Sequence, residues 1–374
     1  MIRSIEPGAE ALSVTWQKGT ASRFPFIWLR DNCRCAKCRD PRNGQRLFDT
    51  LDLPAEPKPQ EASLDGDGVA IRWAGEDHES RYGSAWLAAH DLAADARAHR
   101  RNSGKHRLWG AEIANDLPQA DWPAVLSNPA EELRLLTGLS DYGFALLHKV
   151  PTEMGQVAAV GDRLGHVRVT NYGQLFDVVS LPNPNNLAFT AVALGVHTDN
   201  PYRDPTPGLQ LLHCLEAGAP GGDTLLVDGF RAAEELRRRH PKDFSILSRL
   251  PLPFYFADAK ADLRASTPII STDFEGNVTA VHFNNRSMTT LDLPEEQILP
   301  WYRAYRRFAA IMREPAGELR IRLSPGDLII MENNRALHGR TAFNPNLGKR
   351  HLQGCYVDKD GVESRRRVLE RGAA

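Results

Sequence analysis

The sequence lacks the long apolar runs that membrane proteins need. No segment of the 374 residues approaches the roughly 18 consecutive apolar side chains of a membrane-spanning helix. The opening residues, MIRSIEPGAEALSV, also lack the apolar core of a secretory signal peptide. We therefore expect a protein of the cytoplasm that has no membrane partner.

An excess of charge of either sign is also missing. The chain has 46 Lys and Arg residues against 47 Asp and Glu residues, so its formal net charge is −1. The basic residues are scattered along the chain, and no global field would attract nucleic acid or anionic lipid. We expect a small-molecule substrate and no nucleic-acid partner.

Cysteine is scarce, and the few cysteines present are unevenly placed. Five in a chain of this length do not make a disulfide scaffold. Three of them nevertheless stand close together as Cys33, Cys35 and Cys38. Such a cluster is typical of a metal site in a reducing compartment. The spacing suits one tetrahedral zinc ion, which needs a fourth ligand.

The fourth ligand must come from elsewhere in the chain. His78 is the best candidate, while Cys214 and Cys355 are alternatives that stand within apolar, strand-like runs typical of core thiols. A site closed by four protein ligands would be structural, because zinc catalysis needs an open position. The alternative is that the three clustered thiols bind no metal, although exposed thiols so close together would oxidise readily.

Proline-rich breaks and a change of pattern suggest two domains. We place the boundary at the break near 115–129, which gives a zinc-binding domain at 1–115 and a second domain at 116–374. From about residue 187, short apolar runs alternate with Gly, Pro, Asn and Asp, as in a sandwich or barrel of short strands. The expected strands are 12–16, 24–29, 69–73, 209–215, 224–227, 268–271, 278–283 and 327–331, and the expected helices are 130–139, 154–164, 232–239 (ended by Pro241) and 295–312.

A His-x-Asp triplet, His197 and Asp199, is the first candidate metal-binding motif. Residues two apart on an extended segment point to the same side, so both side chains can contact one ion. A distant second histidine, His338, would complete a face of two histidines and one carboxylate, as in non-haem Fe(II) oxygenases. The triplet alone is a weak signal, because a surface histidine near an aspartate is common.

The surrounding sequence strengthens this interpretation. A Gly-Gly-Asp-Thr run occupies 221–224, and a Pro-Gly-Asp turn at 325–327 begins a strand-like run that leads to His338. Arg350 follows about one hairpin later, where its guanidinium could pair bidentately with a dicarboxylate. The alternative is that Arg350 is a surface charge.

From about residue 130 onward, these motifs resemble the taurine-dioxygenase-like branch of the 2-oxoglutarate oxygenases. The resemblance implies that His197, Asp199 and His338 bind Fe(II), that Arg350 anchors 2-oxoglutarate, and that Thr224 assists it. Dioxygen is then the second co-substrate. It also implies a mostly β fold with flanking helices, in which a double-stranded β-helix (jelly-roll) core follows a small zinc-binding N-terminal β domain.

Two further runs narrow the resemblance. Trp-Leu-Arg-Asp-Asn-Cys at 28–33 and Arg-His-Leu-Gln-Gly-Cys-Tyr-Val-Asp at 350–358 are similar to the γ-butyrobetaine and trimethyllysine hydroxylase group. The resemblance then covers nearly the whole chain and implies a homodimer. A zinc-containing module that only binds quaternary ammonium compounds is a different possibility, but it would need no iron site. No glycine-rich fingerprint follows a strand, which disfavours a nicotinamide or flavin enzyme.

Substrates of this group carry a trimethylammonium head, which has no proton to donate. Aromatic faces can hold such a cation, and each contact contributes up to ~2 kcal/mol when desolvated. The positions that match the family's aromatic cage are Tyr172, Phe176, Phe189 and Tyr356. Without the resemblance, each of these four aromatic residues would more often be interpreted as part of the hydrophobic core.

The anionic end of the substrate matches a second group of positions. Asn186 and Asn284 correspond to family positions that hold a carboxylate, and four other polar residues depart from the usual pattern: Asn200, Tyr202, Asn285 and Arg286. A phosphonate would reward the added cation and donors more than a carboxylate. The best match is hydroxylation of 2-(trimethylamino)ethylphosphonate to its 1-hydroxy product, and the alternative is conversion of γ-butyrobetaine to L-carnitine. The alternative is that Arg286 pairs with Asp292.

Overall fold

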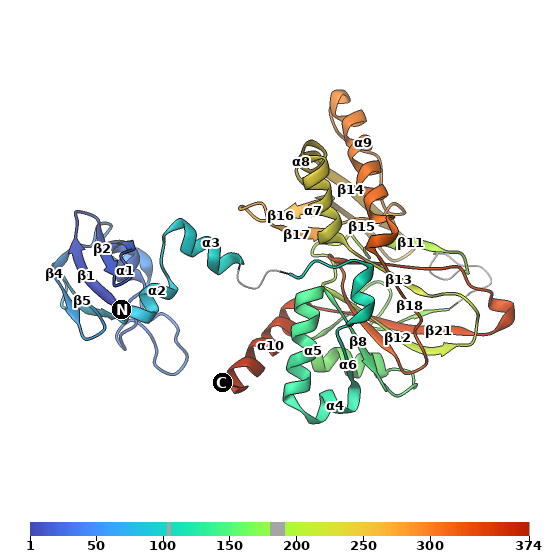
Figure 1. Ribbon diagram of the computed structural model, residues 1–374, viewed down its shortest axis with the longest axis horizontal. Helices are drawn as coiled ribbons and strands as arrows, with labels where there is room; N and C mark the ends of the chain where they lie inside the picture. Colours follow the sequence, from blue (N-terminus) through green and yellow to red (C-terminus); the bar gives the residue numbers. More distant parts are fainter. Residues whose placement is uncertain (103–105, 180–190, 374) are drawn as a thin grey trace. The chain divides into compact units, whose positions relative to one another are not determined.

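The computed structural model describes residues 1–102, 106–179 and 191–373, and the chain divides into two compact units (Figure 1). The units are Met1–Lys105 and His106–Ala374. The division therefore falls after Lys105 rather than after residue 115. The reason is that Trp109 belongs to the second unit, where it is buried with its ring centroid 4.9 Å from that of Phe144.

Small antiparallel sheets form the first unit. The pairing orders are β1-β2-β3 and β4-β5-β6, and the inward residues of both sheets build one apolar core that includes Leu12, Phe24 and Trp73. Its elements are β1 (Ile2–Pro7), β2 (Ala11–Trp16), β3 (Ala21–Pro25), α1 (Phe26–Asp31), η1 (Thr50–Asp52), β4 (Pro59–Asp65), β5 (Gly68–Trp73), β6 (Glu79–Tyr82), α2 (Ser84–Ala89) and α3 (Ala94–Asn102).

The strand expected at 24–29 is wrong in its second half. Strand β3 ends at Pro25, and helix α1 begins at Phe26. Phe26, Leu29 and Arg30 are buried, which is the i, i+3, i+4 spacing of a helix face. The aromatic and β-branched composition of this run favoured a strand, but its period is helical. Helix α1 therefore leads the chain directly to Cys33.

Two sheets face each other in the second unit. The larger has the order β10-β21-β12-β19-β8-β7, with β9 also paired to β21, and the smaller has the order β11-β20-β13-β18. The larger contains β7 (Gln119–Asp121), β8 (Phe144–His148), β9 (Val167–Arg168), β10 (Phe176–Val178), β12 (Leu209–Ala217), β19 (Leu328–Glu332) and β21 (Arg350–Val357). The smaller contains β11 (Leu194–His197), β13 (Thr224–Asp228), β18 (Glu318–Ile321) and β20 (Ala336–Arg340).

The path of the chain between these sheets confirms the predicted double-stranded β-helix. Strands β11, β13 and β20 lie in the smaller sheet, whereas β12, β19 and β21 lie in the larger one, so the chain passes repeatedly from one to the other. The strands expected at 209–215, 224–227 and 327–331 are confirmed as β12, β13 and β19. The two histidines of the metal-binding motifs thus stand on paired strands, and Asp199 follows the end of β11.

Four of the described helices cover the larger sheet. Helices α4 (Trp122–Ser127), α5 (Pro129–Tyr142), α6 (Gln156–Leu164) and α10 (Lys359–Ala373) share an apolar cluster with β8, β12, β19 and β21. Buried Glu132 of α5 holds α6 and α10 together, because Arg163 and Arg365 each lie 2.7 Å from its Oε2. Short 3-10 turns are η2 (Ala111–Asn115), η4 (Pro315–Gly317) and η5 (Pro345–Leu347).

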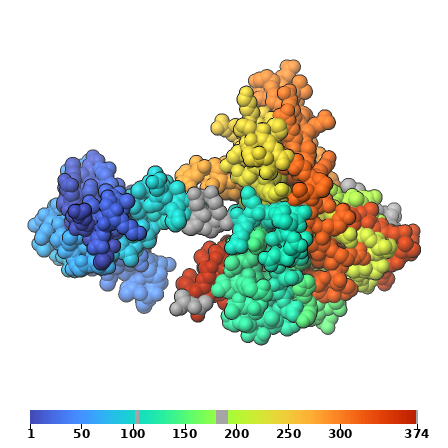
Figure 2. All heavy atoms as spheres, viewed as in Figure 1, coloured from blue at the N-terminus to red at the C-terminus, as the bar shows by residue number. Residues whose placement is uncertain are grey.

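A separate lobe, drawn in yellow to orange, stands out from the body of the second unit (Figure 2). It contains α7 (Gly229–Arg239), α8 (Pro241–Arg249), β14 (Pro251–Ala257), β15 (Asp262–Pro268), β16 (Ile270–Thr272), β17 (Val278–Val281) and α9 (Glu295–Met312). Pro241 ends α7 as predicted but also begins α8, because proline is well tolerated at a helix's first position. In the described parts of the chain, no helix is long and apolar enough to cross a membrane.

Candidate active site

Strand pairing places the two histidines of the predicted triad side by side. His197, at the end of β11, is the direct partner of His338 on β20, and the ring centroids are 4.5 Å apart. Asp199 turns back toward both: its Oδ1 lies 3.3 Å from His197 Nε2 and its Oδ2 lies 3.9 Å from His338 Nε2. One ligand atom from each residue lies within 4.8 Å of the others, so the three could hold one metal ion.

The protonation states of this cluster suit a divalent cation. Burial, and then the nearby His197, lower the pKa of His338 to about 3, so its imidazole is neutral and has a lone pair to donate at pH 7. Burial would raise the pKa of Asp199, but its contacts with His197, His338 and the Tyr356 hydroxyl hold that pKa well below its usual range. Two imidazoles and one carboxylate are the donor set of a facial Fe(II) site.

Asn333 fixes the backbone of the aspartate. Its Oδ1 accepts a hydrogen bond from the Asp199 backbone N–H at 2.7 Å, and its Nδ2 donates to the Asp199 carbonyl at 2.9 Å. Asn333 is fully buried between β19 and β20. The turn that leads the chain to His338 therefore also positions Asp199. Sequence reasoning did not assign Asn333 a role, although the Asn-Asn pair at 333–334 was a possible signal.

A pocket of about 350 Å³ opens onto the triad. Asn285 does not line it; its Oδ1 instead lies 3.5 Å from the Tyr305 hydroxyl. Asn186 and Phe189 fall outside the described residues. The other predicted co-substrate and substrate positions all line the pocket, namely Tyr172, Phe176, Asn200, Tyr202, Thr224, Asn284, Arg286, Arg350 and Tyr356.

One wall of the pocket carries the cationic groups that a dicarboxylate needs. Arg350 is partly buried and donates from Nε to the carbonyl of Gly222 at 3.3 Å. Gly222 has φ +74°, and a Cβ there would lie 2.7 Å from that Nε, so this glycine makes room for the guanidinium. Thr224 is buried and directly opposite Arg340 in the pairing of β13 with β20. Thr224 and Arg350 therefore fit a bound carboxylate.

Arg340 is a pocket residue that sequence reasoning missed. It follows His338 by two positions on β20, so both side chains point to the same side of the strand. Burial, followed by repulsion from Arg350 and Arg286, lowers the pKa of Arg340 to about 10. The pocket thus concentrates positive charge, which a dianionic co-substrate and an anionic substrate group would offset.

Aromatic rings form two groups in the pocket. Phe176 of β10 packs against Tyr356 of β21, with ring centroids 5.1 Å apart. A Cβ on Gly354 would lie 2.6 Å from the Phe176 ring, so glycine at this position lets that ring lie across β21. In the second group, the Tyr172 and Tyr202 hydroxyls are 3.0 Å apart, and the Tyr202 hydroxyl lies 2.6 Å from Asn200 Oδ1.

Phe256 joins the second aromatic group and was also missed. Its ring stacks on Tyr202 at 5.1 Å and lies 5.8 Å from the ring of Tyr172. It comes from β14, which no motif marked and which the sequence analysis did not predict as a strand. A long-range contact of this kind leaves no local signal in one sequence.

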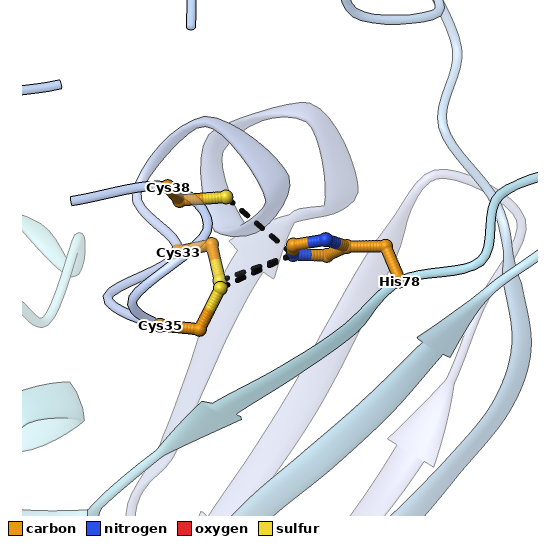
Figure 3. Close-up of side chains that lie close together, drawn as sticks. All are labelled: Cys33, Cys35, Cys38 and His78. Atoms are coloured by element: carbon orange, nitrogen blue, oxygen red, sulfur yellow. Dashed lines mark hydrogen bonds between the residues drawn. The ribbon is translucent and has the colours of Figure 1, made fainter. Parts of the chain in front are cut away.

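The cysteine cluster is assembled in the first unit (Figure 3). His78 Nε2 lies 3.3 Å from Cys33 Sγ, 3.8 Å from Cys35 Sγ and 3.5 Å from Cys38 Sγ. The four ligand atoms are mutually within 4.8 Å. The two alternative thiols, Cys214 and Cys355, are buried on strands of the second unit.

The chemistry of this cluster fits a dication. Burial and the adjacent thiols raise the pKa of Cys38 to about 12, so thiolates at this position need a compensating positive charge. Arg30 contributes part of it, with Nη1 3.6 Å from Cys38 Sγ, while its Nη2 pairs with Glu76 at 2.7 Å. A zinc ion would supply the rest and accept four ligands of its preferred types.

Comparisons with known proteins agree with this geometry. Residues 4–88 match the model for the N-terminal domain of gamma-butyrobetaine hydroxylase-like proteins, and residues 99–356 match that of the taurine catabolism dioxygenase TauD, TfdA family. A gamma-butyrobetaine dioxygenase from Pseudomonas sp. is 38% identical, over 97% of this chain and 94% of that protein. A trimethyllysine dioxygenase from Meyerozyma guilliermondii is 31% identical, over 97% and 94% respectively.

Among solved structures, an asparagine oxygenase in complex with Fe(II), 3-hydroxyasparagine and succinate is 19% identical, covers 61% of this chain and 79% of its own, and has a TM-score of 0.49. The family assignment rests on the sequence matches, which span both units and include a match over more than half of the chain. The chain therefore belongs to the gamma-butyrobetaine and trimethyllysine dioxygenase group of the TauD, TfdA family and is an Fe(II)- and 2-oxoglutarate-dependent hydroxylase.

Proposed function

We propose that this enzyme hydroxylates 2-(trimethylamino)ethylphosphonate on the carbon beside phosphorus, giving the 1-hydroxy product. The observation that carries the proposal is the presence of Arg286 in the pocket, together with the side chains of Asn200, Tyr202 and Asn284. These groups offer a cation and several hydrogen-bonding atoms to one anionic end. The aromatic rings of the same pocket provide for the trimethylammonium end.

In this proposal, His197, Asp199 and His338 bind Fe(II), and Arg350 with Thr224 binds the distal carboxylate of 2-oxoglutarate. Bound iron, with 2-oxoglutarate and dioxygen, supplies the oxidising power that converts a C–H bond into C–OH, with succinate and carbon dioxide as the other products. The protein's own residues orient that C–H bond and exclude water. Cys33, Cys35, Cys38 and His78 bind a structural zinc ion.

The ammonium head is assigned to the rings of Phe176 and Tyr356, with Tyr172 nearby. Tyr356 keeps its proton, because burial and the adjacent Asp199 carboxylate raise its pKa well above the ordinary value. Its hydroxyl donates a hydrogen bond to Asp199 Oδ2 at 2.8 Å, which leaves the ring face for the cation. A quaternary ammonium bound there gains cation–π attraction without any hydrogen bond.

The anionic end is assigned to Arg286 and its polar neighbours. In the described part of the chain, Arg286 forms no ion pair with Asp292; it lines the same pocket as Asp199, Tyr172 and Tyr202. Asn284 Oδ1 accepts from the Arg286 backbone N–H at 3.1 Å and so fixes the start of this segment. A phosphonate has three oxygens and up to two charges, so it uses these donors more fully than a carboxylate does.

The second candidate is conversion of γ-butyrobetaine to L-carnitine. It is favoured by the 38% identity to the Pseudomonas gamma-butyrobetaine dioxygenase. A substrate panel decides between the two. The purified enzyme is supplied with Fe(II), 2-oxoglutarate and either trimethylaminoethylphosphonate, γ-butyrobetaine, trimethyllysine or taurine, and succinate and product mass are measured. Preference for γ-butyrobetaine would overturn the phosphonate proposal.

Arg286→Ala is expected to lower kcat/KM for the phosphonate roughly ten- to a hundredfold, because a hydrogen bond to a charged group contributes ~1.5–3 kcal/mol. The loss with γ-butyrobetaine should be much smaller. Succinate formation without substrate should persist, because the triad and Arg350 are untouched. Arg320→Ala, which removes an exposed arginine of β18, is the control. Equal losses with both substrates would show that Arg286 does not discriminate between the anions.

Phe256→Ala is expected to lower kcat/KM for short zwitterions roughly two- to tenfold while sparing the longer trimethyllysine. Removing the ring takes away the stacking partner of Tyr202 and enlarges the pocket, and loss of one aromatic contact costs ~0.5–1.5 kcal/mol. Steady-state kinetics on the same panel measures the effect, with Phe274→Ala, an exposed ring on the β16–β17 turn, as control. A uniform loss across all substrate lengths would contradict a role in size selection.

A further inference from the structure

We infer that Gln210 is a positioning residue for the iron ligand Asp199, one that fixes which carboxylate oxygen is offered to the metal. The inference rests on the proposed binding of iron by the triad. Gln210 lies on β12, is 3% exposed and lines the pocket. Its Nε2 donates to Asp199 Oδ2 at 2.7 Å.

Sheet register explains how two donors reach the same oxygen. Gln210 on β12 is the direct cross-strand partner of Tyr356 on β21, and directly paired residues project to the same face of a sheet. The Tyr356 hydroxyl donates to Asp199 Oδ2 at 2.8 Å, beside the bond from Gln210. Gln210 and Tyr356, neighbours on the larger sheet, therefore both bind one carboxylate oxygen of Asp199. Asp199 itself follows β11 of the smaller sheet.

The orientation of the Gln210 amide follows from its surroundings. Asp199 Oδ2 is an acceptor, so the amide nitrogen, and not the amide oxygen, must face it. The other end, Oε1, is buried and has no hydrogen-bond partner among the described residues. The amide thus leaves its own acceptor unsatisfied while it donates to Asp199, an arrangement that costs stability and is therefore more readily explained by a role in the site.

The chemical consequence concerns how the carboxylate binds. A carboxylate can coordinate through one oxygen or through both, and the second mode would occupy a position needed for 2-oxoglutarate or dioxygen. Two donors on Oδ2 compete with a metal for that oxygen. Oδ1, which lies 3.3 Å from His197 Nε2, then remains as the single ligand atom. Groups that orient a metal ligand in this way typically change metal affinity 10–100-fold when removed, as an order of magnitude.

The test is Mn(II) binding by Gln210→Leu, followed through the electron paramagnetic resonance signal of free Mn(II). Manganese prefers nitrogen and oxygen donors, so it reports the triad and not the thiol cluster. We expect the Kd for Mn(II) to rise about tenfold or more. Gln210→Asn, whose shorter amide cannot span the same distance, should show the same rise and serves if the leucine variant fails to fold.

Gln353→Leu is the matched control. Gln353 is equally buried and lies on β21 but accepts from Gly155 N–H at 2.6 Å and donates to Asp177, away from the triad. It should lower the melting temperature and leave the Kd for Mn(II) unchanged. An unchanged Kd in both Gln210 variants, or an equal rise in Gln353→Leu, would overturn the role of Gln210. Failure of the proposed iron site is a separate result: Asp199→Ala would then bind Mn(II) as tightly as the wild type.

Discussion

Asp199→Ala and His197→Ala should each abolish hydroxylation while leaving the fold intact. Each removes one ligand from a set of three, and the remaining two cannot hold iron in the geometry that leaves three positions open. The aspartate also carries the only negative charge among the three ligands, so its loss removes the principal electrostatic attraction for a dication. Succinate release and product mass at saturating Fe(II) measure activity, and the far-ultraviolet circular dichroism spectrum reports the fold.

A second histidine–aspartate contact in the same unit supplies the control. His148 Nδ1 lies 2.7 Å from Asp327 Oδ1, but this pair stands outside the pocket, and Gln119 rather than a third metal ligand lies 3.0 Å from His148 Nε2. His148→Ala should therefore retain turnover. Near-wild-type turnover by His197→Ala or Asp199→Ala at saturating Fe(II) would remove the triad from the mechanism.

The His-x-Asp part of the triad was predictable from local sequence. The side chains of a histidine and an aspartate two positions apart on an extended segment point to the same side. The Pro-Gly-Asp turn also indicated the strand that leads to His338. The sequence could not show that His197 and His338 are direct partners across β11 and β20, because that register joins segments separated by about 140 residues. The family resemblance, and not spacing, connected them.

The residues that were missed share one property. Gln210 and Arg340 reach the site through strand pairing, Phe256 through ring stacking and Asn333 through hydrogen bonds from a turn, and none stands in a motif whose spacing alone implies chemistry. Such long-range contacts are decided by the fold as a whole. Conversely, Asn285 stands in the predicted Asn-Asn-Arg run but does not line the pocket, because residues 285–287 form a turn in which the Asn285 side chain lies against Tyr305.

The secondary-structure errors have a comparable origin. Helix α1 was taken for a strand because six residues are too few to reveal a helical period against an aromatic-rich composition. Helix α10 was not predicted, because it is mostly charged and buries little beyond Val362. Its place is fixed instead by Arg365, which pairs with the buried carboxylate of Glu132 more than 200 residues earlier in the chain.

Cys35→Ser should remove zinc from the protein and unfold much of the first unit. Binding of structural zinc contributes roughly 10–16 kcal/mol in small zinc-dependent modules, whereas the whole stability of a domain is about 5–15 kcal/mol. The cluster joins the loop after α1 to His78, next to β6, and so connects the two small sheets. Without the ion, that connection is lost, and thiols held near one another repel once more than one of them ionises.

Metal content by mass spectrometry, with limited proteolysis of the first unit, measures both effects on protein purified without chelator. The wild type should hold one zinc ion per chain, and Cys35→Ser and His78→Ala should hold far less and be cleaved faster. Cys214→Ala is the control: this buried thiol on β12 lies outside the cluster, so the variant should keep its zinc even if its core is weakened. Zinc-free wild-type protein that resists proteolysis would refute a structural zinc site, because the four side chains would then hold the unit together without an ion.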